Sequence, residues 1–270
     1  MISGVFGGLA SRRNKLLPVQ EAVSLIKSHD TLTVSGFVSQ GCPECLLRHV
    51  GSSSDVFGLT VLFEGGPGDY ATKGINHLAV RPGLLSRSIG AHYGQVPKLA
   101  ELALADKVAA YALPMGSVSR MLRSASNHTP GHITRVGLGT FVDPRLGGGK
   151  LNAKAKAAGE LVKLVELDGV EYLQYSAIPV RVALIRASTS DPAGNLSFER
   201  ESLLTDAKLM CMAAKASGGI VIAQVSRVVQ VGMTLSRECT FLPRGLSTDI
   251  GEEIALFHIP TQRAYSRCVS

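Results

Sequence analysis

Residues 26–47, IKSHDTLTVSGFVSQGCPECLL, carry the pattern that decides the fold. A β-branched run from Thr31 to Val34 leads into a glycine-bearing turn, Gly36 to Gly41, and Pro43-Glu44 then opens the next apolar segment. This order predicts a strand, a glycine loop and the start of a helix. Such a loop places backbone N–H groups at the positive end of a helix, where they suit a phosphate, a carboxylate or a developing oxyanion.

The same alternation of short apolar runs and helical patterns continues along the chain. It predicts strands at 32–34, 59–63, 87–91, 108–113, 180–186 and 220–225, and helices at 19–27, 44–50, 97–106, 117–126 and 201–217. Alternation of this kind favours an α/β fold, with a mostly parallel sheet flanked by helices. Residues 134–175 are richer in glycine and charge, and we expect loops and short hairpins there. The lysines in this stretch are more typical of a solvated helix face than of a phosphate-binding patch; they are Lys150, Lys154, Lys156 and Lys163.

Composition indicates a globular chain and excludes several classes. With 270 residues, 45% of them apolar and 18% charged, the chain can bury a sizeable core, and no apolar run approaches the ~20 residues of a membrane span. Five irregularly spaced cysteines favour a reducing compartment. We expect a cytoplasmic protein, with a mitochondrial one as the alternative because Arg12, Arg13 and Lys15 lie near the N-terminus. The net charge of +7 suits an anionic partner, but scattered bases and 5% aromatics do not indicate nucleic acid.

The order Ser35-Gly36-Phe37, three residues, Gly41, one residue, Pro43-Glu44 resembles the first glycine loop of the family I coenzyme A transferases, in their acetate/propionate branch. Further blocks resemble that family in register: 76–79, 90–94, 97–99, 113–116, 136–145, 148–150, 182–186, 191–195 and 218–225. The resemblance covers about residues 15–250 and extends only over the N-terminal (α) half of a two-half enzyme. We therefore expect a transferase-like domain at 1–250 and a divergent tail at 251–270.

The resemblance implies transfer of coenzyme A between a short-chain acyl-coenzyme A and a carboxylic acid, with coenzyme A as substrate, no cofactor and no metal. It implies a homodimer or a complex with a second-half protein, and no nucleic acid or membrane partner. The residues that match the family's substrate-binding motifs are Gly36, Phe37, Gly41, Gly66, Gly68, Asp69, His92, Met115 and Gly116.

The family's nucleophile is a glutamate of the second half, which lies outside this sequence. Glu64 in Glu64-Gly65-Gly66-Pro67 mimics the nucleophile sequence, but the family's first half does not carry its nucleophile there, so we expect a carboxylate of the site rim. Met115 stands where the family has glutamine, and a thioether cannot donate that amide's hydrogen bond. Acyl transfer should therefore be weakened. The alternative is that Met115 only fills the core.

Two other motifs and two other functions remain open. Gly66 to Ala71 fits the dinucleotide pattern G-x-G-x-x-A, but no acidic residue ends a second strand about 20 residues on. Cys42 and Cys45 have the spacing of a redox pair at a helix start, but nothing nearby completes a zinc site. Besides a transferase α subunit, the chain could be a truncated, non-catalytic paralogue that binds acyl-coenzyme A or a partner. An unrelated small-molecule enzyme on a similar sheet is the third class.

Overall fold

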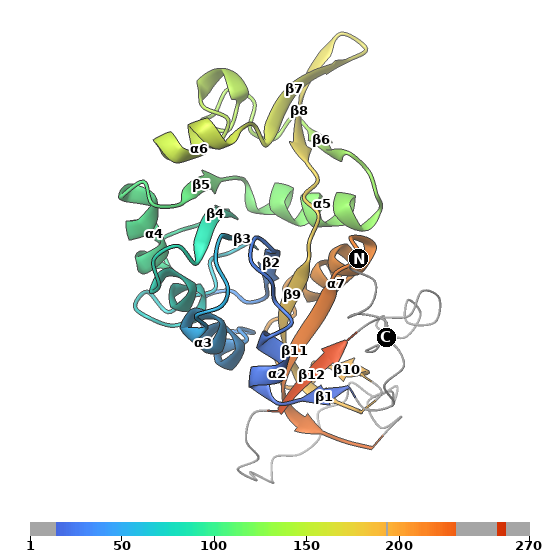
Figure 1. Cartoon of the computed structure of the whole chain (residues 1–270). Helices are drawn as coiled ribbons and strands as arrows, with labels where there is room; N and C mark the ends of the chain where they lie inside the picture. The colour runs from blue at the N-terminus through green and yellow to red at the C-terminus, as the bar shows by residue number, and fades with distance from the viewer. Residues whose placement is uncertain (1–14, 193, 231–252, 258–270) are drawn as a thin grey trace.

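The computed structural model describes residues 15–192, 194–230 and 253–257, which form a large mixed sheet with helices on both faces and a small projecting sheet (Figure 1). The helices are α2 (Val19–Val23), α3 (Glu44–Ser52), α4 (Pro97–Leu104), α5 (Met115–Ser126), α6 (Ala153–Ala158) and α7 (Ala207–Ala216), with 3-10 turns η1 (Gly74–Ala79) and η2 (Pro144–Leu146). The large sheet contains β1 (Leu16–Leu17), β2 (Thr31–Val34), β3 (Leu59–Phe63), β4 (Leu85–Gly90), β5 (Ala109–Ala112), β9 (Val182–Ser190), β10 (Leu196–Ser197), β11 (Ile220–Val228) and β12 (Glu253–Phe257). The small sheet contains β6 (Gly131–Thr134), β7 (Val162–Leu167) and β8 (Val170–Ser176).

The large sheet has the strand order β1-β12-β11-β9-β2-β3-β4-β5, with β10 paired to β9. Every neighbouring pair from β11 to β5 is parallel, and each antiparallel pair of this sheet includes β10 or β12. The predicted α/β class with a mostly parallel sheet is confirmed. Because the strands from β11 to β5 run in one direction, their carboxyl ends meet at a single edge of the sheet.

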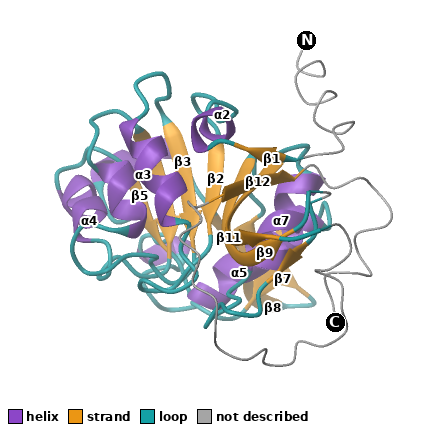
Figure 2. Cartoon of the chain, turned by 90° about the horizontal axis from the view of Figure 1, so that it is seen from below, coloured by secondary structure: helices purple, strands orange, loops and turns teal. Residues whose placement is uncertain are grey.

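Two helical layers enclose the sheet, with α2, α3 and α4 on one face and α5 and α7 on the other (Figure 2). Leu46, Leu47 and Val50 on α3 recur at helical spacing and are fully buried in the first apolar cluster. Val118 and Met121 on α5 belong to the second cluster, on the opposite face. The parallel strands are therefore buried on both sides, which explains their continuous apolar runs.

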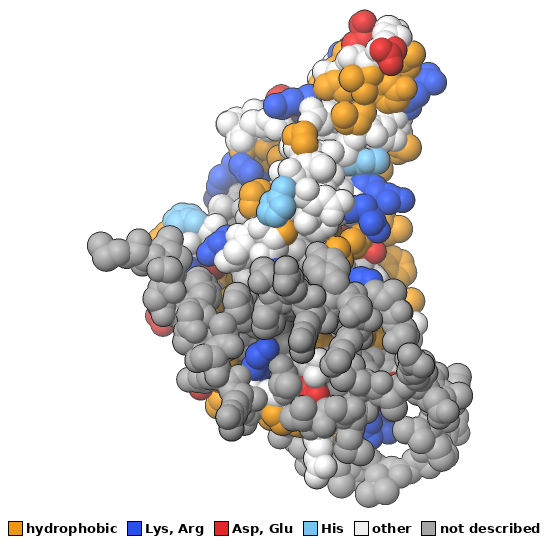
Figure 3. Space-filling view, turned by 90° about the vertical axis from the view of Figure 1, so that its right-hand side faces the viewer, with side chains coloured by type: hydrophobic (Ala, Val, Ile, Leu, Met, Phe, Trp, Pro, Cys, Tyr) orange, Lys and Arg blue, Asp and Glu red, His pale blue; other side chains and the backbone are white. Residues whose placement is uncertain are grey.

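The small antiparallel sheet projects from the body of the molecule (Figure 1). On β8, Leu173 and Tyr175 are fully buried, whereas Leu164, Leu167 and Val170 on the β7–β8 hairpin are partly exposed. Figure 3 shows apolar side chains gathered on the projecting end of the molecule, with acidic side chains at its tip. This sheet corresponds to the loops and short hairpins expected in residues 134–175.

The predicted helix at 201–217 starts later than expected, at Ala207. Residues 198–206 before it form an irregular segment of turns and bends, which is held against β9: the N–H of Arg200 donates to Oγ of Ser188 (2.8 Å), and Arg186 pairs with Glu201 (3.4 Å). The helix predicted at 19–27 ends at Val23. There the hydroxyl of Ser24 donates to the carbonyl of Glu21 (2.8 Å), and a turn follows. Both differences arise from side-chain contacts that compete with helix hydrogen bonds.

The other predicted helices and the six predicted strands are confirmed, with ends displaced by a few residues. The sequence did not indicate β1, β10, β12, η1 or η2. Of the lysines expected on a solvated helix face, Lys154 and Lys156 lie exposed on α6. Lys163 instead lies exposed on strand β7, and Lys150, ahead of α6, pairs with Glu160. β12 lies in the expected tail and pairs with β11 and β1; the division at residue 250 stays a prediction. Within the described ranges, no helix is both long enough and apolar enough to cross a membrane.

Candidate active-site edge

Four loops that carry the predicted site residues leave neighbouring parallel strands at the carboxyl edge of the sheet. Gly36, Phe37 and Gly41 follow β2, and Glu64 opens the loop after β3 that contains Gly66, Gly68 and Asp69. His92 follows β4, and Met115 and Gly116 begin α5 directly after β5. Carboxyl edges of open α/β sheets are the usual places for ligands. The topology therefore places all the predicted site residues along one edge.

The glycine loop after β2 is a tight turn fixed from both sides. Phe37 and Gln40 exchange backbone hydrogen bonds of 3.0 Å, and Gly36 and Gly41 have φ values of 119° and 62°. Oγ of Ser35 donates to the carbonyl of Gly41 (2.8 Å) and accepts the N–H of Arg186 (3.0 Å). The positive φ values require glycine, and the serine ties the turn to β9. The loop is thus preorganised.

The start of helix α3 corrects one expectation. The N–H groups of Cys45 and Leu46 donate to Oε1 of buried Gln224 on β11, at 2.9 and 3.4 Å. The expectation that this helix start presents free N–H groups to an anion is wrong for these two donors. Gln224 satisfies them because they would otherwise be buried without partners.

The loop after β3 packs closely on the loop after β4. A Cβ atom at Gly66 would lie 2.6 Å from the carbonyl oxygen of His92, and one at Gly68 would collide with that of Gln95. The imidazole of His92 in turn hydrogen-bonds the side chain of Gln95. Only residues without a side chain fit at Gly66 and Gly68. The two glycines therefore bring these loops together, whatever ligand they meet.

Asp69 is occupied by its own turn. Its Oδ1 accepts the N–H groups of Ala71 (3.0 Å) and Lys73 (2.8 Å). Slight burial acts to raise the pKa of Asp69, but these backbone donors outweigh it and lower the pKa below the ordinary value. Across the same loop, Glu44 accepts the N–H of Gly74 (2.8 Å) and pairs with His77 (2.6 Å). Asp69 and Glu44 thus hold the rim in shape.

Glu64 is the titratable group that the structure perturbs most clearly at this edge. Burial, together with the hydrogen-bonded carboxyl of Asp206, raises the pKa of Glu64 to about 9. Oε1 of Glu64 is buried and has no hydrogen-bond partner among the described residues. The side chain is therefore protonated at neutral pH and is a poor nucleophile in that form. Its contact with Asp206 brings the segment before α7 to the site.

Met115 and Gly116 lie at the opposite end of this row of loops. Met115 is 52% exposed at the first position of α5, so its side chain does not fill the core. The N–H of Leu113 donates to the carbonyl of Gly90 (3.0 Å), which continues the pairing of β5 with β4 to the edge. Because β3 and β4 lie between β2 and β5, the strands that lead to the Gly36 loop and to Met115 are about 14 Å apart, at ~4.8 Å per strand spacing. Contact of Met115 with a ligand held at the Gly36 loop stays a prediction.

The cysteine pair after Gly41 lacks the features of a reactive dithiol. Burial, with the nearby charge of Glu44, raises the pKa of Cys42 well above its ordinary range, although Arg186 acts against this. Cys45 is buried on α3, 3.6 Å from Nδ1 of His49. In the part of the chain that the structure describes, no three His, Cys, Asp or Glu side chains are placed to hold a metal.

Sequence reasoning missed the segment 199–206, which lies over the carboxyl edge. Ser202 donates to the side chain of Gln40 (2.6 Å), and a Cβ atom at Gly41 would lie 3.2 Å from the carbonyl oxygen of Leu203. Asp206 reaches Glu64 from the same segment. No local pattern marks this role, because the pattern of residues 201–217 predicts one amphipathic helix.

Comparison with known proteins identifies the family. The coenzyme A transferase family model matches residues 17–240. Acetate CoA-transferase YdiF of Escherichia coli K12 is 40% identical over 224 residues, which are 81% of this chain and 41% of that protein. Caffeate CoA-transferase of Acetobacterium woodii is 37% identical over 215 residues, 78% of this chain and 40% of that protein. The chain thus spans about two fifths of the length of these relatives.

Solved structures agree with this comparison. The YdiF apoenzyme of Escherichia coli O157:H7 superposes with a TM-score of 0.78 at 38% identity, over 82% of this chain and 43% of that one. Glutaconate coenzyme A-transferase of Acidaminococcus fermentans shares the fold, with a TM-score of 0.64 at 15% identity over 80% of this chain and 68% of that one. The chain belongs to the coenzyme A transferase family. Its matched region corresponds to the α half of the family I enzymes.

Proposed function

We propose that the chain supplies the α half of an enzyme that transfers coenzyme A between a short-chain acyl-coenzyme A and a carboxylic acid. The observation that carries the proposal is the family match over residues 17–240, together with the four loops that this region gathers at one edge. The curated relatives that are 40% and 37% identical are an acetate and a caffeate CoA-transferase. Coenzyme A is a substrate in this reaction, and the proposal requires no further cofactor or metal.

The reaction needs a nucleophilic carboxylate, which we assign to a second half. A glutamate attacks the thioester carbonyl and expels coenzyme A thiolate, forming an acyl anhydride with the enzyme. The thiolate then attacks the glutamyl carbonyl and releases the donor acid, which leaves a glutamyl-coenzyme A thioester. The acceptor carboxylate reverses these steps and leaves as the new acyl-coenzyme A. The second half comes from another chain or from a longer form of this one.

Glu64 is not that nucleophile in our proposal. Attack requires the carboxylate, but Glu64 has a pKa raised to about 9 and shares its surroundings with the carboxyl of Asp206. A protonated carboxyl can instead donate a hydrogen bond. We assign Glu64 to the rim of the site, with its neutral form as the resting state.

The α half contributes the shape of the acyl-binding edge. The fixed turn at Gly36 and Gly41 presents backbone to the site, and the paired loops at Gly66 and His92 form the next part of the edge. Met115 supplies no hydrogen-bond donor where a glutamine would, so a developing oxyanion loses one stabilising contact there. Slow acyl transfer follows from this departure, even with a second half present.

Exposed apolar side chains along the edge support a protein partner. Large apolar residues with more than a third of their surface exposed on these loops and the adjoining segment are Phe37, Tyr70, Met115, Leu203 and Leu204. Apolar side chains gathered beside a polar site are typical of a surface that another protein covers. We propose a complex with a second-half protein, or a homodimer of this chain. Sedimentation that finds a stable monomer at micromolar concentration, with and without a second half, would contradict this.

The alternative is a non-catalytic paralogue that binds acyl-coenzyme A or a partner subunit. Met115 and the protonated Glu64 favour this alternative, because Met115 supplies no hydrogen-bond donor for an oxyanion and a protonated Glu64 is a poor nucleophile. Borohydride reduction after incubation with propionyl-coenzyme A distinguishes the two. The chain alone should give no reducible glutamyl thioester, and a complex with a second half should give one on that half if the chain is an enzyme. Binding of acyl-coenzyme A without any adduct in the complex would favour the paralogue.

A further inference from the structure

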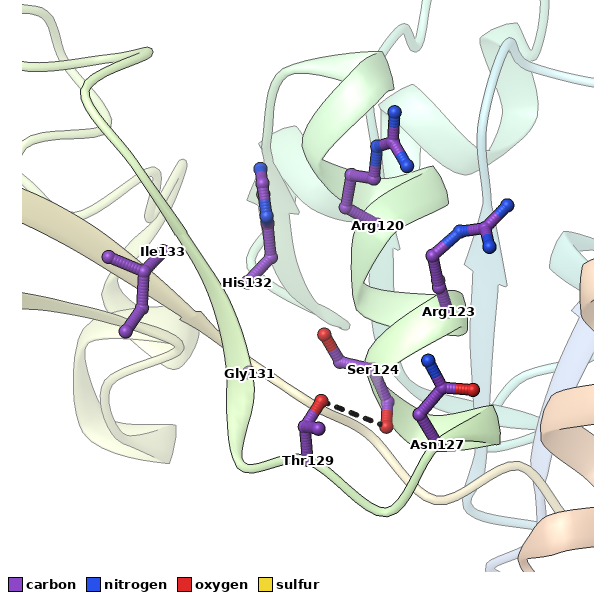
Figure 4. Close-up of a pocket in the computed structure, with 8 residues that line it drawn as sticks. All are labelled: Arg120, Arg123, Ser124, Asn127, Thr129, Gly131, His132 and Ile133. Carbon is purple, nitrogen blue, oxygen red and sulfur yellow. Dashed lines mark hydrogen bonds between the residues drawn. The ribbon is translucent and has the colours of Figure 1, made fainter.

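A second polar site lies away from the carboxyl edge, in an open groove of about 450 Å³ between the last turns of α5 and strand β6. Its lining residues are Arg120, Arg123, Ser124, Asn127, Thr129, Gly131, His132 and Ile133. Arg120 lies five positions after Met115, or about 7 Å along the helix axis, and the groove extends away from there. Figure 4 shows Arg120 and Arg123 projecting from successive turns of α5, with His132 beside Arg120.

The two guanidinium groups have no carboxylate partner in the parts of the chain that the structure describes, and no acidic residue lines the groove. Some other arginines do pair with carboxylates, as Arg145 does with Asp143 (2.8 Å) and Arg186 with Glu201 (3.4 Å). Two neighbouring positive charges without a counterion repel each other. An anion in the groove would relieve this repulsion.

The polar groups around the arginines suit a phosphate group. Guanidinium groups bind phosphate oxygens in a bidentate manner, and residues three apart on a helix lie on the same face. The amide of Asn127 and the hydroxyl of Thr129 lie at the end of the groove, where Thr129 also donates to the carbonyl of Ser124 (3.3 Å). The volume lies within the range of small-molecule sites.

The local electrostatic balance favours the anion. The C-terminus of a helix carries about half a negative charge, which opposes anion binding, but two full positive charges outweigh it. The last carbonyls of α5 are also engaged, since the N–H of Thr129 donates to Ser124 (3.0 Å) and that of Asn127 to Arg123 (3.1 Å). Burial and, after it, the positive charge of Arg120 lower the pKa of His132 on β6.

We infer that the groove between α5 and β6 binds a phosphate-bearing small molecule through Arg120 and Arg123. The phosphate could belong to the nucleotide end of coenzyme A or to a separate phosphorylated compound, and the chemistry of recognition is the same. Phosphate binding here is independent of the proposed transfer activity, because the groove's charges are present whether or not the edge loops catalyse anything.

The test is binding of inorganic phosphate to the full chain, measured by calorimetry at low ionic strength. The double variant Arg120→Gln/Arg123→Gln should weaken binding at least ~tenfold, because it removes two charge-assisted hydrogen-bonding groups. The matched control, Lys156→Gln/Lys163→Gln, removes the same charge from exposed positions on α6 and β7 and should bind as the unchanged chain does. Circular dichroism checks that both double variants are folded.

Competition identifies the source of the phosphate. Displacement of inorganic phosphate by coenzyme A, but much less by 3′-dephospho-coenzyme A, would assign the groove to the nucleotide's 3′-phosphate. Displacement by neither, with phosphate binding retained, would assign it to a separate phosphorylated compound. Phosphate binding that is absent from the unchanged chain at millimolar concentration, or equal in the arginine and lysine variants, would overturn the inference.

Discussion

Replacing Glu64 by glutamine should flatten the dependence of stability on pH. In the unfolded chain the pKa of Glu64 returns to about 4.5, whereas in the folded chain burial and Asp206 raise it to about 9. Between these two values the folded state keeps a proton that the unfolded state releases. The free energy of unfolding contributed by Glu64 is therefore fully present below pH 4.5 and falls as the pH rises toward 9.

The size of this effect follows from one proton. One proton changes the free energy of unfolding by at most ~1.4 kcal/mol per pH unit. Because Glu64 stays partly exposed, we expect about half of this slope, which amounts to a loss of ~1–2 kcal/mol between roughly pH 6 and 8. The Glu64→Gln variant cannot titrate and should lose that much less stability over the same interval. Urea denaturation at several pH values measures the difference.

Two further variants make this result specific. Glu166→Gln, at an exposed position on β7, should keep the slope of the unchanged chain. Asp206→Asn should reduce the slope only in part, because burial, the larger cause of the raised pKa, remains. Equal slopes for Glu64→Gln and the unchanged chain would show that Glu64 is ionised in the folded protein, and would refute the argument against it as a nucleophile.

Three other predictions concern single positions. With a second half supplied, Met115→Gln should raise coenzyme A exchange by ~tenfold or more, on a scale of ~10² to 10³ per oxyanion donor, whereas Leu104→Gln on exposed α4 should not. Gln224→Leu should lower the free energy of unfolding by ~1–3 kcal/mol, because two N–H groups at the start of α3 lose their acceptor; an unchanged denaturation midpoint would contradict this. Gly74→Ala should be more destabilising than Gly169→Ala. Both glycines have positive φ, but an added Cβ would collide with a backbone carbonyl at Gly74 and would meet open space at Gly169. Equal melting temperatures for the two variants would contradict this.

The parallel sheet and the row of site loops could be predicted from local patterns. The β-branched run at 31–34 and its following glycine turn specify a strand and its exit, and similar strands in parallel must place their exits at one edge. The resemblance to the family's motifs assigns Gly36, Gly66 and His92 to one site, and the parallel topology places them along one edge of the sheet. The turn residues needed no long-range information, because positive φ at Gly36 and Gly66 is a local requirement.

Contacts between distant segments could not be predicted in this way. Gln224 caps α3 from 179 positions away along the chain, and nothing in its strand pattern marks a polar partner. Asp206 falls within the helix predicted at 201–217, yet it lies before Ala207 and contacts Glu64. The pKa of Glu64 depends on that contact and on burial, both of which are tertiary features. Local sequence therefore indicated where Glu64 lies but not its protonation state.

Exchange of coenzyme A between propionyl-coenzyme A and acetate, measured with and without a second half, decides whether this chain is the α half of a transferase. The part of acetate CoA-transferase YdiF beyond its matched region is a suitable second half, with sedimentation to verify the complex. We predict no exchange by the chain alone, exchange by the complex, and a borohydride-reducible thioester on the second half. Exchange by the chain alone with an adduct at Glu64, or a verified complex without exchange, would contradict the proposed function.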